Sequence, residues 1–257
     1  MGKEKLRTCF VVGGGPSLSD FYFNLLRDKT TIVVNSSIFF VPNPDFFISM
    51  DYTWFLKNNV EYGVSSPYFK SKAKKYFVVG FKGDRCIKTE HGVIDRNFNL
   101  EYDLRVVDET IHASQYGGIG TTFEDFRCGR ESGYSALQLA IVLGYERIYL
   151  LGMDLATVRC RTKEVSYNSH VSFSPPKQGK STVVKLGLGG KTHFYKSTGR
   201  SDLRTMDTRF KKFLLPYPDA VKEIEEKTNC RVFSCSPISK LNKFFKYVPV
   251  EKAIRKS

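Results

Sequence analysis

Residues 9–18 read CFVVGGGPSL, and this stretch decides the fold. The run from Cys9 to Val12 is apolar, as in a buried strand, and Gly13 to Ser17 follow it as a tight turn. Ser19 and Asp20 then stand before the amphipathic stretch Phe21 to Leu26, which predicts a helix. A strand, a glycine turn and a helix in this order are typical of the opening unit of a nucleotide-binding sheet, in which backbone N–H groups of Gly13, Gly14 and Gly15, with Ser17, approach a phosphate. The alternative is that the three glycines only form a tight turn between strand and helix.

Two further apolar runs end in polar residues. Thr31 to Val34 is followed by Asn35 and Ser36, and Asp45 to Ser49 is followed by Asp51. Ligands of open α/β sheets bind at the carboxyl ends of the strands, so these three polar residues are candidate binding residues.

A helix that is apolar almost all round is predicted over residues 134–143. Ser132 and Gly133 lead into it, with Ser132 as the expected N-cap, and Gly144 is the expected stop. Its N-terminus should point to the ligand edge of the sheet.

A strand from Arg147 to Leu151 follows, and Gly152 and Asp154 at its end are further candidate nucleotide-binding residues. For Asp51 and Asp154 a ligand role and a local capping role are equally open. Other strands are predicted at Tyr76–Val79, Leu104–Val107 and Arg231–Phe233, and other helices at Leu203–Leu215 and Asp219–Thr228.

These elements predict a single α/β domain over residues 1–257, Rossmann-like, with a mostly parallel sheet and helices on both faces. Residues 156–200 show no sustained periodicity and predict a long lid or irregular insertion. A basic tail follows at 240–257.

The charge of the chain restricts its partners. Its 257 residues carry 40 Lys and Arg against 26 Asp and Glu, a net charge of +14. This excess attracts polyanions such as nucleic acid, anionic membranes or phosphorylated substrates, and it does not choose among them.

The six cysteines include no C-x-x-C pair, so neither a zinc site nor a disulfide framework is predicted. The first residues run into the first strand without a long apolar stretch, which predicts a cytoplasmic protein.

Two nucleotide motifs are incomplete. The dinucleotide fingerprint needs glycine where Leu18 stands, and an acidic residue where the second strand ends in Asn35. Gly179 to Ser181 resembles the end of a P-loop, but Ser174 replaces the required glycine.

Several blocks occur in the order of a known family. They are Val12 to Leu18, Asn35, Glu131 to Asp154 with the run ALQLAIVLGYERIYLLGMD, Thr192 to Tyr195, and Cys230 to Leu241. In this order they resemble the bacterial sialyltransferases that use CMP-sialic acid to extend lipooligosaccharides. The glycine-proline-serine turn and the Gly-Met-Asp strand end also resemble archaeal hydroxymethylpterin diphosphokinases and flagellin-modifying glycosyltransferase-like proteins. The segment Pro44 to Asp51 resembles this second group more closely than it resembles the sialyltransferases.

The sialyltransferase resemblance implies that a nucleotide is held by Gly14, Gly15, Ser17, Asn35, Ser132 and Gly133. It also implies that a histidine and tyrosines of the lid serve catalysis, for which His193 and Tyr195 are the candidates. The sequence departs from the family after this segment, where Lys196 and Ser197 stand in place of the family's base.

Three functions follow as hypotheses. The first is a transfer of a sialic-acid-like sugar from a CMP-linked donor to a hydroxyl of a glycan or lipid-linked acceptor, without a metal or other cofactor. The second is a Mg²⁺-dependent diphosphokinase in which Asp51 or Asp154 carries the ion. The third is a non-catalytic nucleic-acid-binding protein. Two interpretations of the basic tail stay open: solvated helix ends, or peripheral contact with an anionic membrane at its inner face. A homo-oligomer also stays open.

Overall fold

The computed structural model describes residues 6–51, 54, 67–80, 87–89, 92–94, 107–160, 165–166, 183–184, 189–193, 196–198 and 200–257.

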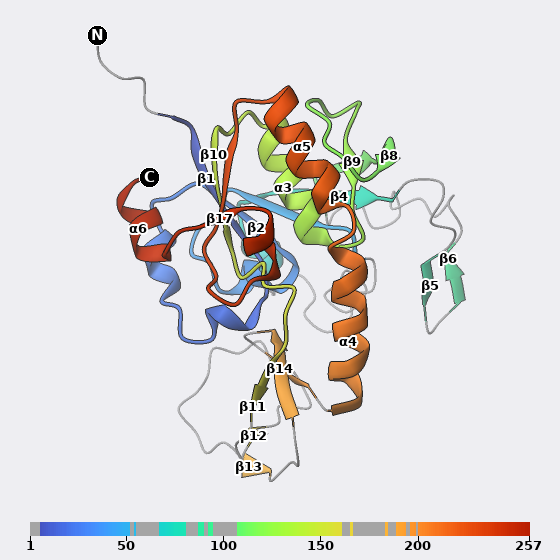
Figure 1. Cartoon of the computed structure of the whole chain (residues 1–257), viewed down its shortest axis with the longest axis vertical. Helices are drawn as coiled ribbons and strands as arrows, with labels where there is room; N and C mark the ends of the chain where they lie inside the picture. Colours follow the sequence, from blue (N-terminus) through green and yellow to red (C-terminus); the bar gives the residue numbers. More distant parts are fainter. Residues whose placement is uncertain are drawn as a thin grey trace.

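An eight-stranded sheet forms the centre of the molecule (Figure 1). Its strand order is β17-β16-β10-β1-β2-β3-β4-β7, and every neighbouring pair runs parallel. The strands are β1 Thr8–Val12, β2 Thr31–Val34, β3 Phe46–Ser49, β4 Lys74–Val79, β7 Glu109–His112, β10 Arg147–Leu151, β16 Arg231–Ser234 and β17 Lys246–Tyr247. The predicted parallel α/β class is confirmed.

The strand order changes direction at β1: β2, β3, β4 and β7 are added on one side of β1, and β10, β16 and β17 are added on the other. The next strand, β2, pairs with one side of β1, and β10 pairs with the other side. Ligands of doubly wound sheets bind at such a switch point, beyond the carboxyl ends of the strands. The segments that follow β1, β2 and β10 therefore lie where a ligand of such a sheet would bind.

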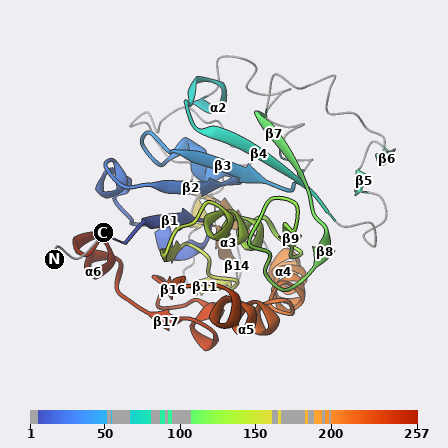
Figure 2. The ribbon, with the colours of Figure 1, turned by 90° about the horizontal axis from the view of Figure 1, so that it is seen from above.

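Both faces of the sheet are covered, because successive strand residues point to opposite sides. Cys9 and Val11 belong to the apolar cluster beneath α3 Ser132–Val142 and α5 Tyr217–Lys227, whereas Phe10 and Val12 pack toward α2 Pro67–Lys70 and α6 Val250–Arg255. Figure 2 shows α3 and α5 on one side of the strands and α6 on the other. Gly144 ends the α3 segment in the left-handed conformation, with φ 77°, as predicted.

The helix predicted after the glycine turn is absent. Two short 3-10 turns replace it, η1 Pro16–Leu18 and η2 Phe23–Leu26. The rings of Phe21 and Phe23 meet edge to face at 5.2 Å, and residues two apart on an α-helix point in different directions. Aromatic packing therefore overrides the amphipathic pattern in this segment.

The described parts of the predicted lid form small antiparallel sheets rather than irregular chain. One contains β11 Val158–Cys160, β14 Gly189–His193 and β15 Lys196–Thr198, and the other β12 Val165–Ser166 and β13 Val183–Val184. Figure 1 shows the first of these sheets below the main sheet, beside the lower half of α4 Arg200–Phe213. The division into one domain and a lid stays a prediction.

The basic tail is folded onto the sheet. It forms η6 Lys240–Lys243, the edge strand β17 and helix α6. Phe245 and Leu241 are buried in the core, and the ring of Phe244 stacks on Tyr217 at 6.0 Å. The aromatic residues between the lysines are therefore largely core residues.

Short strands complete the described chain. β5 Ile87–Thr89 pairs with β6 Gly92–Ile94, and β8 Gln115–Tyr116 pairs with β9 Arg127–Cys128. The strand predicted at 104–107 falls mostly outside the described residues, and the strand beside β4 is β7. No helix among the described residues is both long and apolar enough to cross a membrane.

Candidate functional site

The ends of β1 and β10 are joined by hydrogen bonds. The Gly13 N–H donates to the Leu151 carbonyl at 2.8 Å, and the Gly15 N–H donates to the Gly152 carbonyl at 2.7 Å. The N–H groups of Gly13 and Gly15 are therefore already hydrogen-bonded within the protein, and they join the turn after β1 to the end of β10.

This close approach explains three of the glycines. A Cβ at Gly13 would lie 2.6 Å from the Gly152 carbonyl oxygen, and one at Gly15 would lie 2.5 Å from the Asp154 carboxylate. Gly152 has φ 60° and packs under Leu18, so it also has no room for a side chain. Gly13, Gly15 and Gly152 are accounted for by backbone packing, and a nucleotide-binding role for them stays a prediction.

Asp154 fixes the turn from the opposite strand end. Its Oδ2 accepts the Ser17 N–H and its Oδ1 accepts the Ser17 hydroxyl, both at 2.8 Å. Burial raises the pKa of Asp154, although the hydrogen bonds from Ser17 act in the opposite direction. Of the two roles open for Asp154, the contacts favour the local one, a buried clamp on Ser17.

Gly14 differs from its neighbours in the turn. Its N–H has no hydrogen-bond acceptor among the described residues, it is half-buried, and its φ is not in the left-handed region. Of the three glycine amides in this turn, the Gly14 N–H is therefore the one for which the described residues supply no acceptor, and its role in binding phosphate stays a prediction.

Asn35 has a buried polar atom without a partner. It follows β2 in the left-handed conformation, with φ 49°, and its Oδ1 makes no hydrogen bond to any described residue. The neighbouring hydroxyls are occupied, since Ser36 accepts the Trp54 indole N–H at 3.0 Å and Ser37 donates to the Gly13 carbonyl at 2.8 Å. A buried amide oxygen left unpaired in this way costs about 1–3 kcal/mol unless a ligand donates to it.

The N-terminus of α3 lies at the same edge but is already capped. The Glu131 carboxylate accepts the Gly133 N–H and, at 2.8 Å, the Tyr217 hydroxyl. Ser132 is not the N-cap; it is the first helical residue, and its hydroxyl accepts the Met50 N–H at 3.0 Å. Burial raises the pKa of Glu131 despite these hydrogen bonds. Glu131 thus holds the end of α3 in place of the predicted Ser132.

Gly133 also serves close packing, because a Cβ there would overlap the Met153 side chain. A nucleotide-binding role of Ser132 and Gly133 is not excluded by these contacts and stays a prediction.

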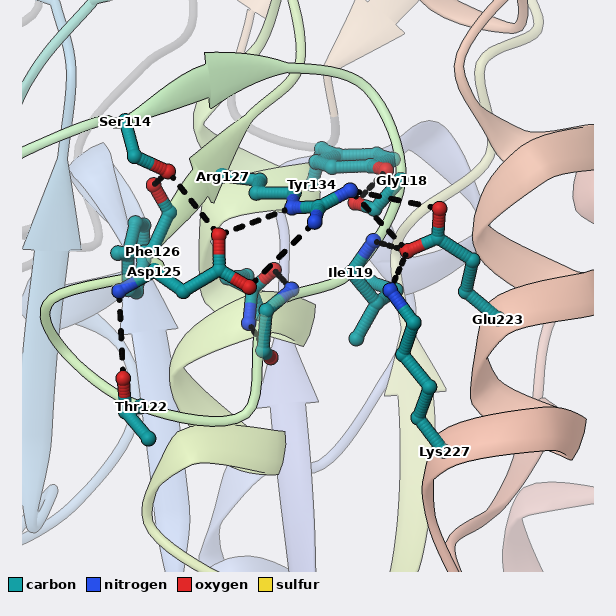
Figure 3. Close-up of polar contacts among 12 residues, drawn as sticks. Ser114, Gly118, Ile119, Thr122, Asp125, Phe126, Arg127, Tyr134, Glu223 and Lys227 are labelled. Carbon is teal, nitrogen blue, oxygen red and sulfur yellow. Dashed lines mark hydrogen bonds and ion pairs between the residues drawn. The ribbon is translucent and has the colours of Figure 1, made fainter.

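A charged network secures the other flank of α3 (Figure 3). Glu223 of α5 accepts the Ile119 N–H at 2.7 Å and forms ion pairs with Arg127 and Lys227. The Tyr134 hydroxyl of α3 donates to the Gly118 carbonyl at 2.6 Å in the same loop. The loop from Gly117 to Arg127 is thereby joined to both α3 and α5.

Two more charged residues, Asp51 and Arg130, lie close in sequence to the end of β3 and to the start of α3. Asp51 is exposed and accepts the Trp54 N–H at 3.3 Å, a local capping contact. Arg130 is exposed directly before the α3 cap, and its Nε donates to the Tyr116 hydroxyl at 3.1 Å.

The fold brings the strand of His193 to the glycine turn. His193 is the last residue of β14, and β14 lies against η1, which follows the turn directly. Tyr195 and the rival His170 lie outside the described residues. Within the described ranges, no group of three or more His, Cys, Asp or Glu could hold a metal ion.

Comparison with known proteins finds similarity in solved structures alone. No protein-family model matches the chain, and no curated protein sequence matches it. The sialyltransferase CstII from Campylobacter jejuni in complex with CMP-3FNeuAc is similar with a TM-score of 0.44 and 14% identity, over 96% of this chain and 88% of that chain. The same values hold for CST-II with a trisaccharide acceptor and CMP, and monomeric CstII gives 0.41 and 15% over 95% and 86%. At this identity, the similarity does not establish the activity of this chain.

Proposed function

We propose that this protein is a glycosyltransferase that moves a sugar from a nucleotide-sugar donor to a hydroxyl acceptor. The sequence blocks that resemble CMP-sialic-acid-dependent sialyltransferases suggest a CMP-linked, sialic-acid-like donor. A glycan or a lipid-linked glycan would supply the hydroxyl.

One observation carries the proposal: the buried Oδ1 of Asn35, which has no hydrogen-bond partner among the described residues and lies at the carboxyl end of β2, beside β1. A ribose hydroxyl or an exocyclic base amine would donate to this oxygen and remove the cost of leaving it unpaired. The Gly14 N–H, which follows the adjacent strand β1, would donate to the phosphate. An acceptor and a donor at neighbouring strand ends suit a nucleotide, which carries both kinds of group.

The reaction would be a direct displacement at the anomeric carbon. The acceptor oxygen forms a bond to this carbon, the bond from the carbon to the phosphate oxygen breaks, and the nucleotide leaves with the electron pair. A base removes the acceptor proton, and His193 is the candidate because an imidazole titrates near neutral pH. Arg130 is a cation that could balance the charge of the leaving phosphate.

The diphosphokinase alternative gains no support from the position of Asp154. That carboxylate is buried and accepts two hydrogen bonds from Ser17, so a magnesium ion there would have to displace the clamp on the turn. In the diphosphokinase alternative, Asp51 would then have to bind the magnesium ion without Asp154.

Replacing Asn35 by glycine is expected to weaken nucleotide binding about tenfold, the loss of one hydrogen bond of about 1–1.5 kcal/mol. Glycine keeps the left-handed backbone, so the change removes the amide without adding strain. Melting curves against CMP, UMP, UDP, GDP, ATP and CMP-sugars would measure the affinities, because a ligand of the folded state raises the melting temperature.

Asn43→Gly is the matched control. Asn43 has the same φ of 49° but is exposed between β2 and β3, so its removal should leave the affinity unchanged. Equal affinities of the two variants, or a wild type that binds none of these nucleotides, would refute the binding site.

Turnover of a CMP-sugar is expected to persist in EDTA, because a monophosphate leaving group can be stabilised by cations and hydroxyls of the protein. Loss of turnover in EDTA and its recovery with Mg²⁺ would instead favour the diphosphokinase chemistry. The assay follows release of CMP with and without the chelator, and ATP with a pterin alcohol serves as the second substrate pair.

A further inference from the structure

We propose that one side of the molecule is a docking surface for an anionic lipid bilayer. This surface, the basic strip, comprises Arg231, Lys240, Lys243, Lys246, Lys252, Arg255 and Lys256. It is built from the edge of the sheet and the C-terminal elements, and it does not depend on the reaction proposed above.

The strip has an unbalanced charge. Residues 229–257 contain seven cationic side chains and a single acidic one, Glu251. Six of the seven cations are exposed and Lys240 is half-buried. In the described part of the chain, none of them forms an ion pair.

The residues of the strip extend from one end of the strands to the other. They begin beyond the carboxyl end of β10, where the Lys240 N–H donates to the Asp154 carbonyl at 2.9 Å. It continues along the edge strand, where Lys246 pairs with Phe233 of β16, and ends where the Lys256 carbonyl accepts from Arg147 at 3.2 Å. Figure 2 shows β16, β17 and α6 along one border of the molecule.

The neighbouring helix has the opposite character. α5 carries four acidic residues against two lysines, and both lysines pair with glutamates one turn away, as in Lys222 with Glu226. The positive charge is therefore concentrated in the strip rather than spread over this side of the protein. At physiological salt, electrostatic interactions between exposed charges are screened beyond about 8 Å. The local concentration of positive charge in the strip therefore determines how strongly this side attracts an anionic surface.

The side chains of the strip suit lipid headgroups. Five of its seven cations are lysines, which act as hydrated point charges, and a cluster of four to eight basic residues is typical of anionic-lipid binding. Phe245 is buried and Phe244 is stacked on Tyr217, so neither offers a platform for stacked bases. Tyr247 and Ile238, each 41% exposed, are large apolar side chains close to the lysines, a pairing that the polar and apolar layers of a bilayer surface accommodate.

The test compares two double variants that change the net charge equally. Lys246→Glu with Lys252→Glu alters the strip, and Lys211→Glu with Lys212→Glu alters exposed positions on α4. Co-sedimentation with vesicles of phosphatidylcholine, with and without phosphatidylglycerol, measures binding. We expect the wild type to bind the anionic vesicles, to leave them at raised salt, and to bind pure phosphatidylcholine weakly. The strip variant should lose about thirtyfold or more in affinity, and the α4 variant about threefold or less.

Equal binding by the strip variant and the wild type, salt-independent binding, or no binding to anionic vesicles would overturn the proposal. So would tighter binding of the wild type to duplex DNA than to the vesicles, if the strip variant loses the DNA, because the surface would then serve nucleic acid. Melting curves of both variants establish that they fold. Turnover on a soluble acceptor is expected to be unchanged in the strip variant, so a failure of docking and a failure of the proposed reaction are distinguishable.

Discussion

Replacing Gly14 by valine is expected to weaken nucleotide binding about a hundredfold or more while the protein stays folded. The Gly14 N–H has no acceptor among the described residues, so a ligand phosphate is its proposed partner. A valine side chain at this half-buried position would hold the phosphate away from the turn, and the loss of a charge-assisted hydrogen bond of about 2–3 kcal/mol is roughly a hundredfold in Kd. Nucleotide titration by calorimetry or thermal shift measures the change.

Gly15→Ala is the contrasting variant, in which stability should fall. Its Cβ would lie 2.5 Å from the Asp154 carboxylate and 2.6 Å from the Gly152 carbonyl oxygen, where the ends of β1 and β10 lie side by side. Overpacking of this kind costs about 1–3 kcal/mol, which lowers the melting temperature of a chain of this size by about 2–12 °C. If Gly14→Val binds nucleotide as the wild type does, or melts as early as Gly15→Ala, the separation of a binding glycine from packing glycines is wrong.

His193→Ala is expected to lower kcat about a hundredfold or more and to remove the acid limb of the pH–rate profile. A general base works only when deprotonated, so turnover by the wild type should fall as the pH drops below the pKa of the base. The alanine variant has no such group to titrate, and its residual rate should not show this fall. The measurement is kcat at saturating donor across the pH range around neutrality.

Two other histidine variants show whether the effect is specific. His112 is exposed at the end of β7, on the edge strand of the sheet, and His112→Ala should keep the wild-type profile. His170→Ala tests the other histidine of the lid segment. If His170→Ala loses the acid limb while His193→Ala keeps it and its turnover, the base is His170.

Local patterns in the sequence were sufficient for the elements of the sheet. Apolar runs of four to five residues that end in glycine or polar residues predicted β1, β2, β3 and β10 within about one residue, because buried parallel strands are apolar on both faces. The same reasoning placed the candidate binding residues at the carboxyl edge, since the strands all run in one direction. It missed the 3-10 turns after the glycine turn, because packing among Phe21, Phe23 and Phe40 competes there with helix propensity.

The sequence by itself determined the fold class, the glycine turn after the first strand and the edge of the sheet at which polar residues gather. Only the tertiary structure decided how those residues are used: which amide of the turn has no acceptor among the described residues, that Asp154 is a clamp on Ser17, and that Glu131 caps α3. Ser17 and Asp154 are 137 residues apart in the chain, and their hydrogen bond exists because β1 and β10 lie side by side. Likewise, burial of the tail aromatics and of the Asn35 oxygen depends on which segments pack over them. Hydrophobic periodicity reports which face of an element is buried, but hydrogen-bond partners are set by the contacts that distant segments make once the chain has folded.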